Sequence, residues 1–547
     1  MFGAGGGTSS YEEIETTDLI VMWGTNAREA HPIFFHHILK GIRNGAKMYA
    51  VDPRRSQTAK FADLWLGLNV GTDIALANGV GKYIVDNGLQ NDDFIAHSTR
   101  GFDDYVESIQ EWSLARTSAV TGLPEEAIAE LAKVYATAES AQLCWTLGIT
   151  EHATGAENVR ALCNLALLTG HVGRYGSGLV PVRGQNNVQG GGDMGALPDR
   201  LTGFQALVDN DVRAKFESAW DCEIPATPGK HLTLMLEAIS DKELTHLYVI
   251  GENPADSDAD INEVREGLQG LELLVVQDIF LTRTASYADV VLPAAAGWAE
   301  TDGTVTNSER RVQIGRKALD PPGQAKDDLE IINLIADRIL PGWGNPTPEE
   351  MWDELRTVSP MHAGMSYDRL ENEGGLQWPC PTLDHPGTLF LHNWLWADDL
   401  DGRDPAPFTA NVWRPPMDEV NEEYPLLMTT GRVLDSYNTG VQSDGFNSPI
   451  RSGEDLDMNP ADAEALGLET GSRVEVSSRR STIDMTIRVQ PDLPAGLCFT
   501  TYHFPETTDV NQLTIEAWDK LSGTSEFKAT AINVVPKVDA GSWVVAK

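Results

Sequence analysis

Residues 18–53, DLIVMWGTNAREAHPIFFHHILKGIRNGAKMYAVDP, decide the fold class. Two short apolar runs at the ends of this stretch are typical of strands, and the segment between them has helical spacing and ends at a glycine. A strand, a helix and a second strand in this order form a βαβ unit, in which the two strands lie parallel. The stretch therefore predicts an α/β protein built on a parallel sheet.

The alternation of strands and helices continues on both sides of this unit, so we expect two α/β domains, residues 1–185 and 186–340. The strands of the second domain are continuous apolar runs, which predicts a sheet covered on both faces. One helix of the first domain should begin with Thr121 as N-cap and Pro124 in its first turn. The other elements expected are helices over residues 72–86, 157–168 and 258–267 and strands in 141–148 (AQLCWTLG), 244–254 (LTHLYVIGENP), 271–280 (LELLVVQDIF) and 288–294 (ADVVLPA).

The C-terminal part of the chain has a different pattern. Residues 341–420 are rich in Trp, Pro and Gly and predict an irregular helical connecting region. Residues 421–547 contain short strand-like runs separated by turn signals, which predict a β-barrel-like domain. The fold class expected is α/β, with two parallel-sheet units and a C-terminal β-barrel-like domain.

Composition excludes several classes of protein. The 547 residues are 41% hydrophobic, so large cores are expected, and 41 basic against 81 acidic residues give a net charge of -40. Such a surface argues against binding to nucleic acid, which needs a basic face. No apolar segment has the length of a signal peptide or a membrane span, so we expect a cytoplasmic protein with no membrane insertion. The five cysteines (144, 163, 222, 380 and 498) have no metal-ligand spacing.

Several predicted strands end in polar residues, where open parallel sheets bind their ligands. Asp52 and Asp278 stand where a carboxylate could bond a ribose hydroxyl or a guanine edge, and Arg54 could neutralise a phosphate. This pattern predicts two nucleotide-sized sites. The alternative is that the Asp-Pro and Asn-Pro pairs merely form turns at the strand ends.

Residues 181–195, PVRGQNNVQGGGDMG, combine one arginine with four side-chain amides and many glycines. Glycines let a backbone approach a flat ligand, and the amides of Gln185, Asn186, Asn187 and Gln189 suit the edge of a heterocycle. The isolated guanidinium of Arg183 suits a small carboxylate, which it can hold bidentately. A long surface turn with Arg183 in a salt bridge is the alternative.

The run GQNNVQGGGDMGALPD at residues 184–199 resembles a sequence motif of one enzyme family. Together with GENPADS, VVQDIFLTRTASYADVVLPAAAGWAETDGTVTNSERRVQ, TTGRVLDSYNTGVQS and EFKATAINV, it resembles the catalytic subunit of the molybdenum or tungsten formate dehydrogenases. These enzymes are molybdopterin oxidoreductases, and the similarity extends from the first residues to about residue 538. The resemblance implies two dinucleotide-binding domains, a barrel that closes over the pterins and a metal held between two molybdopterin guanine dinucleotides. It also implies formate as substrate and separate electron-transfer subunits as partners.

The resemblance assigns roles to individual residues. Arg183 would orient formate at the metal. The predicted cofactor contacts are Asn26, Asp52, Arg54, Gly71, Thr72 and Asp73 for one dinucleotide, Gly251, Glu252, Gln277 and Asp278 for the other, Gly431, Arg432, Asn438, Thr439, Gly440, Asn511, Phe527 and Lys528 from the barrel, and Gly148, Gly184 and Gln185 between them.

The chain departs from the family pattern at its start. Family members carry an iron–sulfur domain and then a metal-ligating cysteine or selenocysteine with an adjacent histidine, upstream of the region that matches Met1. We therefore expect a chain incomplete at its N-terminus, with no metal ligand of its own, an iron–sulfur cluster only in the missing segment, and weak or absent turnover. A misplaced start codon or partial gene, a split enzyme and a cofactor-free descendant are the three explanations.

Two rival functions stay open. One is another bis-pterin oxidoreductase, such as a nitrate-type reductase, although Asn438 stands where many relatives that do not use formate have histidine, which favours formate. The other is a non-catalytic scaffold relative of the superfamily. A plain NAD-dependent dehydrogenase is disfavoured, because no G-x-G-x-x-G follows the first strand.

Overall fold

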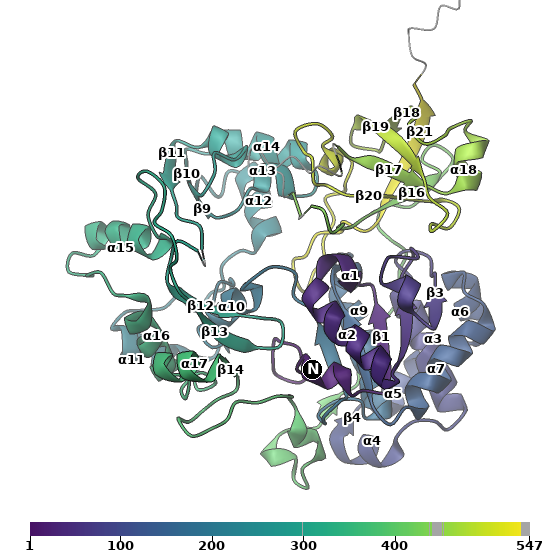
Figure 1. Ribbon diagram of the computed structural model, residues 1–547, viewed down its shortest axis with the longest axis horizontal. Coiled ribbons are helices and arrows are strands. Elements are labelled where there is room, and N and C mark those ends of the chain that lie inside the picture. Colours follow the sequence, from purple (N-terminus) through teal and green to yellow (C-terminus); the bar gives the residue numbers. More distant parts are fainter. Residues whose placement is uncertain (298, 437, 440–450, 452, 538–547) are drawn as a thin grey trace, which may run out of the picture.

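The computed structural model describes residues 1–297, 299–436, 438–439, 451 and 453–537 (Figure 1). Four parts follow one another along the chain: a first α/β unit, a second α/β unit, a small antiparallel sheet and a closed barrel. In Figure 1 the barrel lies next to the first unit, and the antiparallel sheet lies on the opposite side of the molecule.

The first unit is a five-stranded parallel sheet in the order β3-β2-β1-β5-β6. The βαβ prediction is confirmed, since α2 (Pro32–Asn44) connects β1 to β2 and ends at Gly45, whose φ of 112° favours glycine. The strands are β1 (Leu19–Trp23), β2 (Lys47–Val51), β3 (Leu64–Leu66), β5 (Ala141–Trp145) and β6 (Gly178–Pro181).

Helices cover both faces of this sheet. Leu19, Val21 and Trp23 of β1 face a core formed with α3 (Asp73–Asp86), α7 (Glu125–Thr137) and α9 (Gly155–Thr169), while Ile20 and Met22 face α2. All five β1 residues are therefore buried, as a continuous apolar strand requires.

The predicted start of α7 is wrong in one detail. Thr121 is not its N-cap but the last residue of α6 (Leu114–Thr121), and its hydroxyl donates to the carbonyl of Thr117. The chain leaves α6 through Gly122, whose φ is 75°, and Pro124 directly precedes α7. Gly122 ends α6, a helix that the sequence pattern did not predict.

The second unit is a three-stranded parallel sheet in the order β11-β10-β9, formed by β9 (His246–Ile250), β10 (Leu273–Asp278) and β11 (Val290–Pro293). Its core packs against α14 (Ile261–Gln269), with α12 (Leu232–Ser240) and α13 (Pro254–Ser257) beside it. The expectation of a sheet covered on both faces is wrong here, because Tyr248, Ile250 and Val290 are each at least 40% exposed on the outer face.

An antiparallel sheet that the sequence did not predict joins distant parts of the chain. It consists of β12 (Gly303–Thr306), β13 (Arg311–Gly315) and β14 (Leu376–Gln377). The fully buried guanidinium of Arg310 holds this region together by donating to the carbonyls of Gly7, Thr388 and Leu389. Three helices follow β13 or lie near it in the chain, α15 (Asp328–Ile339), α16 (Pro348–Val358) and α17 (Tyr367–Glu373). Two more precede the second unit in the chain but contact this region, α10 (Val188–Asp193) through β12 and α11 (Asn210–Trp220) through α16.

The barrel prediction is confirmed. Six strands close in the order β16-β20-β17-β19-β18-β21. They are β16 (Leu426–Thr430), β17 (Asp455–Met458), β18 (Arg473–Ser477), β19 (Thr482–Val489), β20 (Leu497–Thr500) and β21 (Thr530–Pro536), with α18 (Pro460–Ala465) between β17 and β18. The remaining short elements are α1 (Ala27–Ala30), α4 (Asp92–Ser98), α5 (Phe102–Ser108), α8 (Leu147–Thr150), β7 (Arg200–Leu201), β8 (Gln205–Ala206), and β4 (Thr99–Arg100) paired with β15 (Ala406–Pro407).

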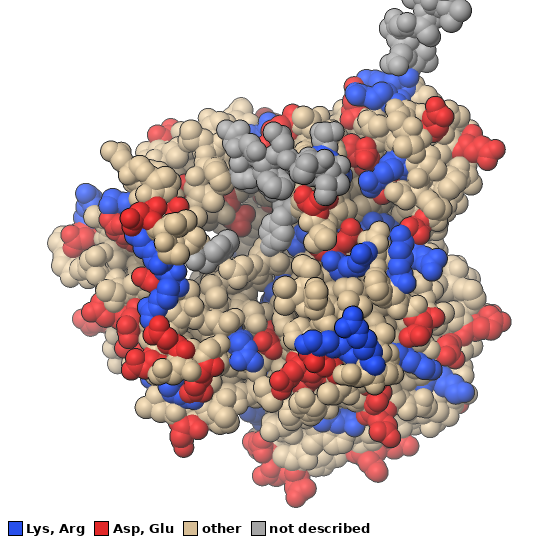
Figure 2. Space-filling model, in the orientation of Figure 1, with Lys and Arg blue, Asp and Glu red and all other residues tan. Residues whose placement is uncertain are grey.

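Acidic side chains are spread over the face seen in Figure 2, as the net charge requires. No helix within the described part of the chain is long and apolar enough to cross a membrane.

Candidate cofactor site

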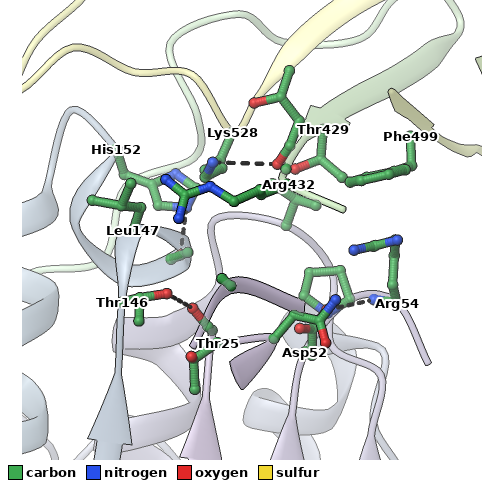
Figure 3. Close-up of a pocket in the computed structure, with 18 of the residues that line it drawn as sticks. Thr25, Asp52, Arg54, Thr146, Leu147, His152, Thr429, Arg432, Phe499 and Lys528 are labelled. Atoms are coloured by element: carbon green, nitrogen blue, oxygen red, sulfur yellow. Dashed lines mark hydrogen bonds between the residues drawn. The ribbon is translucent and has the colours of Figure 1, made fainter. Parts of the chain in front are cut away.

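Two adjoining cavities lie between the sheets and the barrel. The first, about 970 Å³ of empty space counted with its opening to solvent, lies at the carboxyl ends of β1, β2 and β5, opposite the barrel strands β16 and β20 (Figure 3). The second, about 1720 Å³ counted in the same way, lies at the carboxyl ends of β9 and β10. Leu147 and Tyr502 line both, so the cavities meet.

The first cavity gathers most of the residues that the sequence assigned to one dinucleotide. Its lining includes Asn26, Asp52, Arg54, Gly71, Asp73, Gly148, Gly184, Gly431, Arg432 and Lys528. Segments about five hundred residues apart thus converge on one space, because the loops after the parallel strands open at the same sheet edge and the barrel lies opposite that edge.

Two glycines bring the loops after β1 and β5 together. Gly24 has a φ of 61°, and a Cβ on Gly148 would lie 2.5 Å from the carbonyl oxygen of Gly24. A side chain at either position would push the loops apart or strain the backbone. These glycines therefore fix the floor of the first cavity.

Cationic groups surround the first cavity. The guanidinium of Arg54 lies 3.5 Å from the ring centroid of Phe499, and its backbone N–H donates to Asp52. Burial alone would lower the pKa of Lys528, but the nearby carboxylate of Glu151, 2.6 Å away, raises it above its ordinary value. Lys528 therefore stays charged at neutral pH, which suits a ligand that carries phosphate.

Two carboxyl groups that line this cavity, those of Asp52 and Asp73, are buried away from water. Burial raises the pKa of Asp52, and it raises the pKa of Asp73 to about 6, although the indole of Trp23 donates to Asp73 at 2.8 Å. Both groups can act as acceptors for hydroxyl or amino groups of a ligand when they are ionised.

The second cavity gathers the residues assigned to the other dinucleotide. Its lining includes Gln185, Gly251, Glu252, Gln277, Asp278, Asn438, Thr439 and Phe527. Burial, with the charge of Asp278 as a smaller contribution, raises the pKa of Glu252. The described lining of this cavity carries four carboxyl side chains and no Lys or Arg, so it is more acidic than that of the first. Its side-chain N–H donors are amides such as Gln185 and Gln277.

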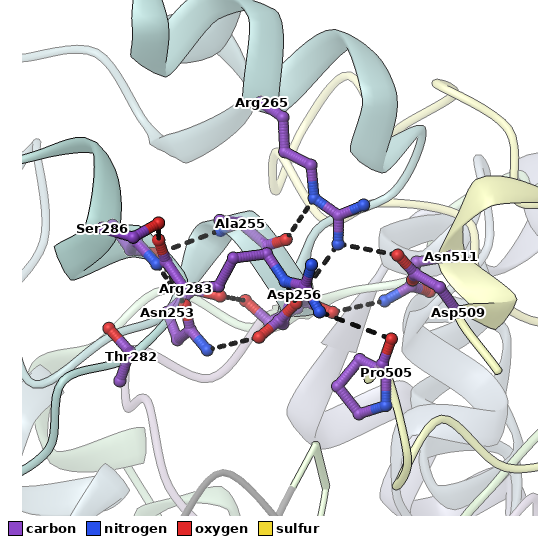
Figure 4. A network of polar contacts seen from close by, with 12 residues as sticks. Asn253, Ala255, Asp256, Arg265, Thr282, Arg283, Ser286, Pro505, Asp509 and Asn511 are labelled. Carbon is purple, nitrogen blue, oxygen red and sulfur yellow. Dashed lines mark hydrogen bonds and ion pairs between the residues drawn. The ribbon is translucent and has the colours of Figure 1, made fainter. Parts of the chain in front are cut away.

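A buried polar network stands behind the second cavity (Figure 4). Asp256 accepts hydrogen bonds from Arg265 (3.2 Å) and Arg283 (2.5 Å), and Arg265 also pairs with Asp509 at 2.6 Å. The predicted cofactor contact Asn511 belongs to this network, since its amide donates to the Asp256 carbonyl at 3.0 Å. The structure thus uses Asn511 to connect the second unit with the barrel.

Arg183 belongs to a segment that borders both cavities. Its neighbours Val182 and Gly184 line the first cavity and Gln185 lines the second. Its Nε donates to Gln189 (2.9 Å) and its Nη2 to the carbonyl of Gly5 (2.8 Å). Within the described residues Nη1 makes no hydrogen bond, so two N–H donors of a fixed cation remain for a ligand.

The amide-rich run after Arg183 is not an open loop. Residues Val188–Asp193 form α10, and Gln189 donates to Gly5 and Asp193 while it accepts from Arg183. The Asn187 side chain accepts from the backbone of Thr306. The expectation that all four amides face a ligand is therefore wrong for Asn187 and Gln189, which hold the loop in place.

The other predicted residues lie elsewhere, and some cavity residues were not predicted. Thr72 is buried at the start of α3, where its hydroxyl donates to Asn69, and Gly440 is outside the described residues. The sequence reading missed Thr25, His31, Thr146, His152 and Tyr502, which line the first cavity. Thr25 and His31 belong to the polar segment after β1, so that segment was their signal.

No group of three His, Cys, Asp or Glu side chains that could hold a metal ion occurs in the described part of the chain. The donor set instead fits an extended organic ligand with anionic groups. Two residues that line the first cavity, Thr25 and His31, each carry a buried polar atom without a partner, the hydroxyl and Nδ1, which supports such a ligand.

Two parallel-sheet units, a closing barrel and two adjoining cavities define an α/β protein that can enclose a two-part nucleotide cofactor. The chain belongs to the molybdopterin oxidoreductase family. The model of that family matches residues 4–338, and the model of the molybdopterin dinucleotide binding domain matches residues 426–531. The chain is therefore an oxidoreductase of the molybdopterin-dependent kind.

Relatives cover nearly the whole chain. The alpha subunit of F420-dependent formate dehydrogenase 2 from Methanococcus maripaludis is 40% identical over 542 residues, which are 97% of this chain and 78% of the relative. Formate dehydrogenase H from Escherichia coli is 36% identical over 98% of this chain and 75% of its own length. The solved acetylene hydratase from Pelobacter acetylenicus has a TM-score of 0.69 at 19% identity, covering 97% of this chain and 78% of that chain, and so shares the fold.

Proposed function

We propose that this chain is the catalytic subunit of a formate dehydrogenase, which oxidises formate to carbon dioxide at a molybdenum or tungsten centre between two molybdopterin guanine dinucleotides. The observation that carries the proposal is the meeting of two cavities bordered by the segment around Arg183, whose guanidinium is fixed by Gln189 and Gly5. Relatives named as formate dehydrogenases over 97–98% of the chain support the substrate.

The two cavities would hold one dinucleotide each. In the first, Arg54, Arg432 and Lys528 would neutralise phosphate, and Asp52 would accept from a ribose or guanine group. In the second, Gln277 and Asp278 would take the corresponding position at the end of β10. Asn438, Thr439 and Phe527 would close this cavity from the barrel side.

When bound, the metal centre would take the two electrons that formate gives up. The residues of this chain would position the substrate for that step. Arg183 would hold the formate carboxylate through Nη1, because Gln189 and Gly5 already fix the rest of its guanidinium. The electrons would leave through a partner electron-transfer subunit.

Metal and nucleotide analysis tests the cofactor. The chain should be purified from cells supplied with molybdate and tungstate, and metal and acid-released guanine nucleotide measured per chain. We expect one molybdenum or tungsten and two guanine nucleotides. A protein that holds neither would be a scaffold relative, and the proposal would be wrong.

The substitution Arg183→Ala tests the substrate site of the loaded enzyme. Loss of a charge-assisted hydrogen bond costs about 1.5–3 kcal/mol, so the KM for formate should rise about 10- to 150-fold. Arg183→Lys keeps the charge without the planar fork and should give an intermediate value. An unchanged KM would give Arg183 another role, and turnover of nitrate in place of formate would favour the nitrate-type alternative.

A further inference from the structure

His31 joins the loop of Arg183 to the first cavity. The residue stands between α1 and α2, directly before Pro32, and its ring lines the first cavity. Its Nε2 lies 2.9 Å from the carbonyl oxygen of Arg183. A single imidazole therefore contacts both the backbone of the substrate-orienting residue and the space for the first dinucleotide.

The hydrogen bond to Arg183 fixes the tautomer of this ring. A carbonyl oxygen can only accept, so Nε2 must carry the proton. Burial, with the nearby charge of Arg432 as a smaller contribution, lowers the pKa of His31 to about 4. The ring is therefore neutral at pH 7, and Nδ1 carries a lone pair that can only accept a hydrogen bond.

This lone pair has no partner within the described residues. The Nδ1 atom of His31 is buried without a hydrogen bond. The same holds for the hydroxyl of Thr25, another residue that lines this cavity and is labelled in Figure 3. Native proteins rarely leave buried polar atoms unpaired. Two such atoms at one cavity indicate a polar ligand, and the imidazole lone pair, which can only accept, requires an N–H or O–H group on it.

We propose that His31 is a cofactor-binding residue: its Nδ1 accepts a hydrogen bond from a donor group of the molecule in the first cavity, while its Nε2–H holds the carbonyl of Arg183. This inference rests on the proposed function. A reduced pterin carries amino and ring N–H groups that can serve as the donor, whereas phosphate oxygens cannot. The cofactor bound in the first cavity would thus be coupled through one ring to the position of Arg183.

A matched pair of substitutions separates the two ends of the ring. In His31→Asn, the amide oxygen takes the place of Nδ1 and the donor to Arg183 is lost. In His31→Gln, the amide nitrogen takes the place of Nε2 and the acceptor facing the cavity is lost. The exposed His36→Gln on the same helix is the control.

The readouts are metal and guanine nucleotide per purified chain, measured alongside the urea midpoint of each variant. We expect His31→Gln to lower cofactor retention during dialysis about tenfold, with a midpoint within experimental error of His36→Gln. His31→Asn should retain the cofactor like the unsubstituted chain and instead raise the KM for formate, because the Arg183 backbone loses its support.

The outcomes are distinct. If the unsubstituted chain is loaded and His31→Gln retains cofactor equally well, the role of His31 is wrong while the proposed function stands. Equal losses in both His31 variants would also contradict it, since they would indicate a structural role. An unsubstituted chain that holds no metal and no guanine nucleotide would overturn the proposed function and this inference together.

Discussion

At the scale of single residues, the close approach of Gly148 to Gly24 sets the width of the first cavity. The two loops follow neighbouring strands, β1 and β5, and touch through backbone atoms. The space between them admits hydrogen but no methyl group. The packing of the two loops therefore requires glycine at position 148, and the cofactor contact there stays a prediction.

The substitution Gly148→Ala should destabilise the protein. Its methyl group would lie 2.5 Å from the Gly24 carbonyl oxygen, so the loops must separate, and overpacking of this kind costs roughly 1–3 kcal/mol. Gly191→Ala is the control, because a Cβ there meets nothing within 4 Å and alanine favours the helix. The measurement is the free energy of unfolding in urea, and equal values for the two variants would show that the loops give way without cost.

Single residues also show the limit of sequence reading. Asp52, Arg54 and Asp278 could be predicted, because a polar residue directly after an apolar strand must lie at the carboxyl edge of its sheet. The hydrogen bonds that Gln189 makes within the protein could not be predicted. Its partner Gly5 is 184 residues away, and no local pattern encodes that contact.

At the scale of elements, the Asp256 network connects α13 and α14 of the second unit with the barrel loop that carries Asp509. Asp256 is 3% exposed as a side chain, and Asn253 donates to it in addition to the two arginines. The network holds the Gly251–Asn253 loop at the rim of the second cavity. Its effect on stability should therefore be large.

Asp256→Ala should lower the free energy of unfolding by about 1.5–3 kcal/mol, because Arg283 and Asn253 lose their partner and Arg265 keeps only Asp509. Asp320→Ala is the matched control, since it removes an exposed ion pair with Lys317 and should change the same quantity by less than about 1 kcal/mol. Urea denaturation of both variants measures the difference. A similar small effect in both would mean that Arg265 and Arg283 find other partners.

Long elements were predictable and short ones were not. The helix α2 and the strand β19 have clear periodicity over many residues, and both were expected. In contrast, β17 is four residues long and carries two aspartates, so its pattern resembles a loop. Strand β14 has only two residues and exists because it pairs with β13.

At the scale of the whole molecule, several buried histidines make the free energy of unfolding depend on pH. Burial lowers the pKa of His171 from 6.5 to about 4, as it does for His152 and His362. Between these two pH values the unfolded chain binds protons that the folded protein does not. Their contribution to stability is therefore present above pH 6.5 and is lost as the pH falls towards 4.

His171→Gln tests this dependence at a residue distant from both cavities. The amide can still donate to the carbonyl of Tyr135 but does not titrate. Between pH 7 and pH 5 the unsubstituted chain should lose up to about 2 kcal/mol more free energy of unfolding than the variant. Buried acids such as Asp73 respond in the opposite direction, but they are the same in both proteins and cancel. Parallel curves against pH would contradict a neutral, buried His171.

The sequence by itself determined the two α/β units, the barrel and the presence of polar residues at the ends of their strands. These features follow from local periodicity and from the fixed geometry of parallel strands, which nearby residues encode. Only the tertiary structure decided which polar atoms are already paired and which face a cavity unpaired. That distinction separates Gln189, whose amide is paired within the protein, from His31 and Thr25, which line the first cavity and carry buried atoms without a partner. It depends on contacts between segments hundreds of residues apart, and burial makes each unpaired atom there unfavourable until a ligand binds.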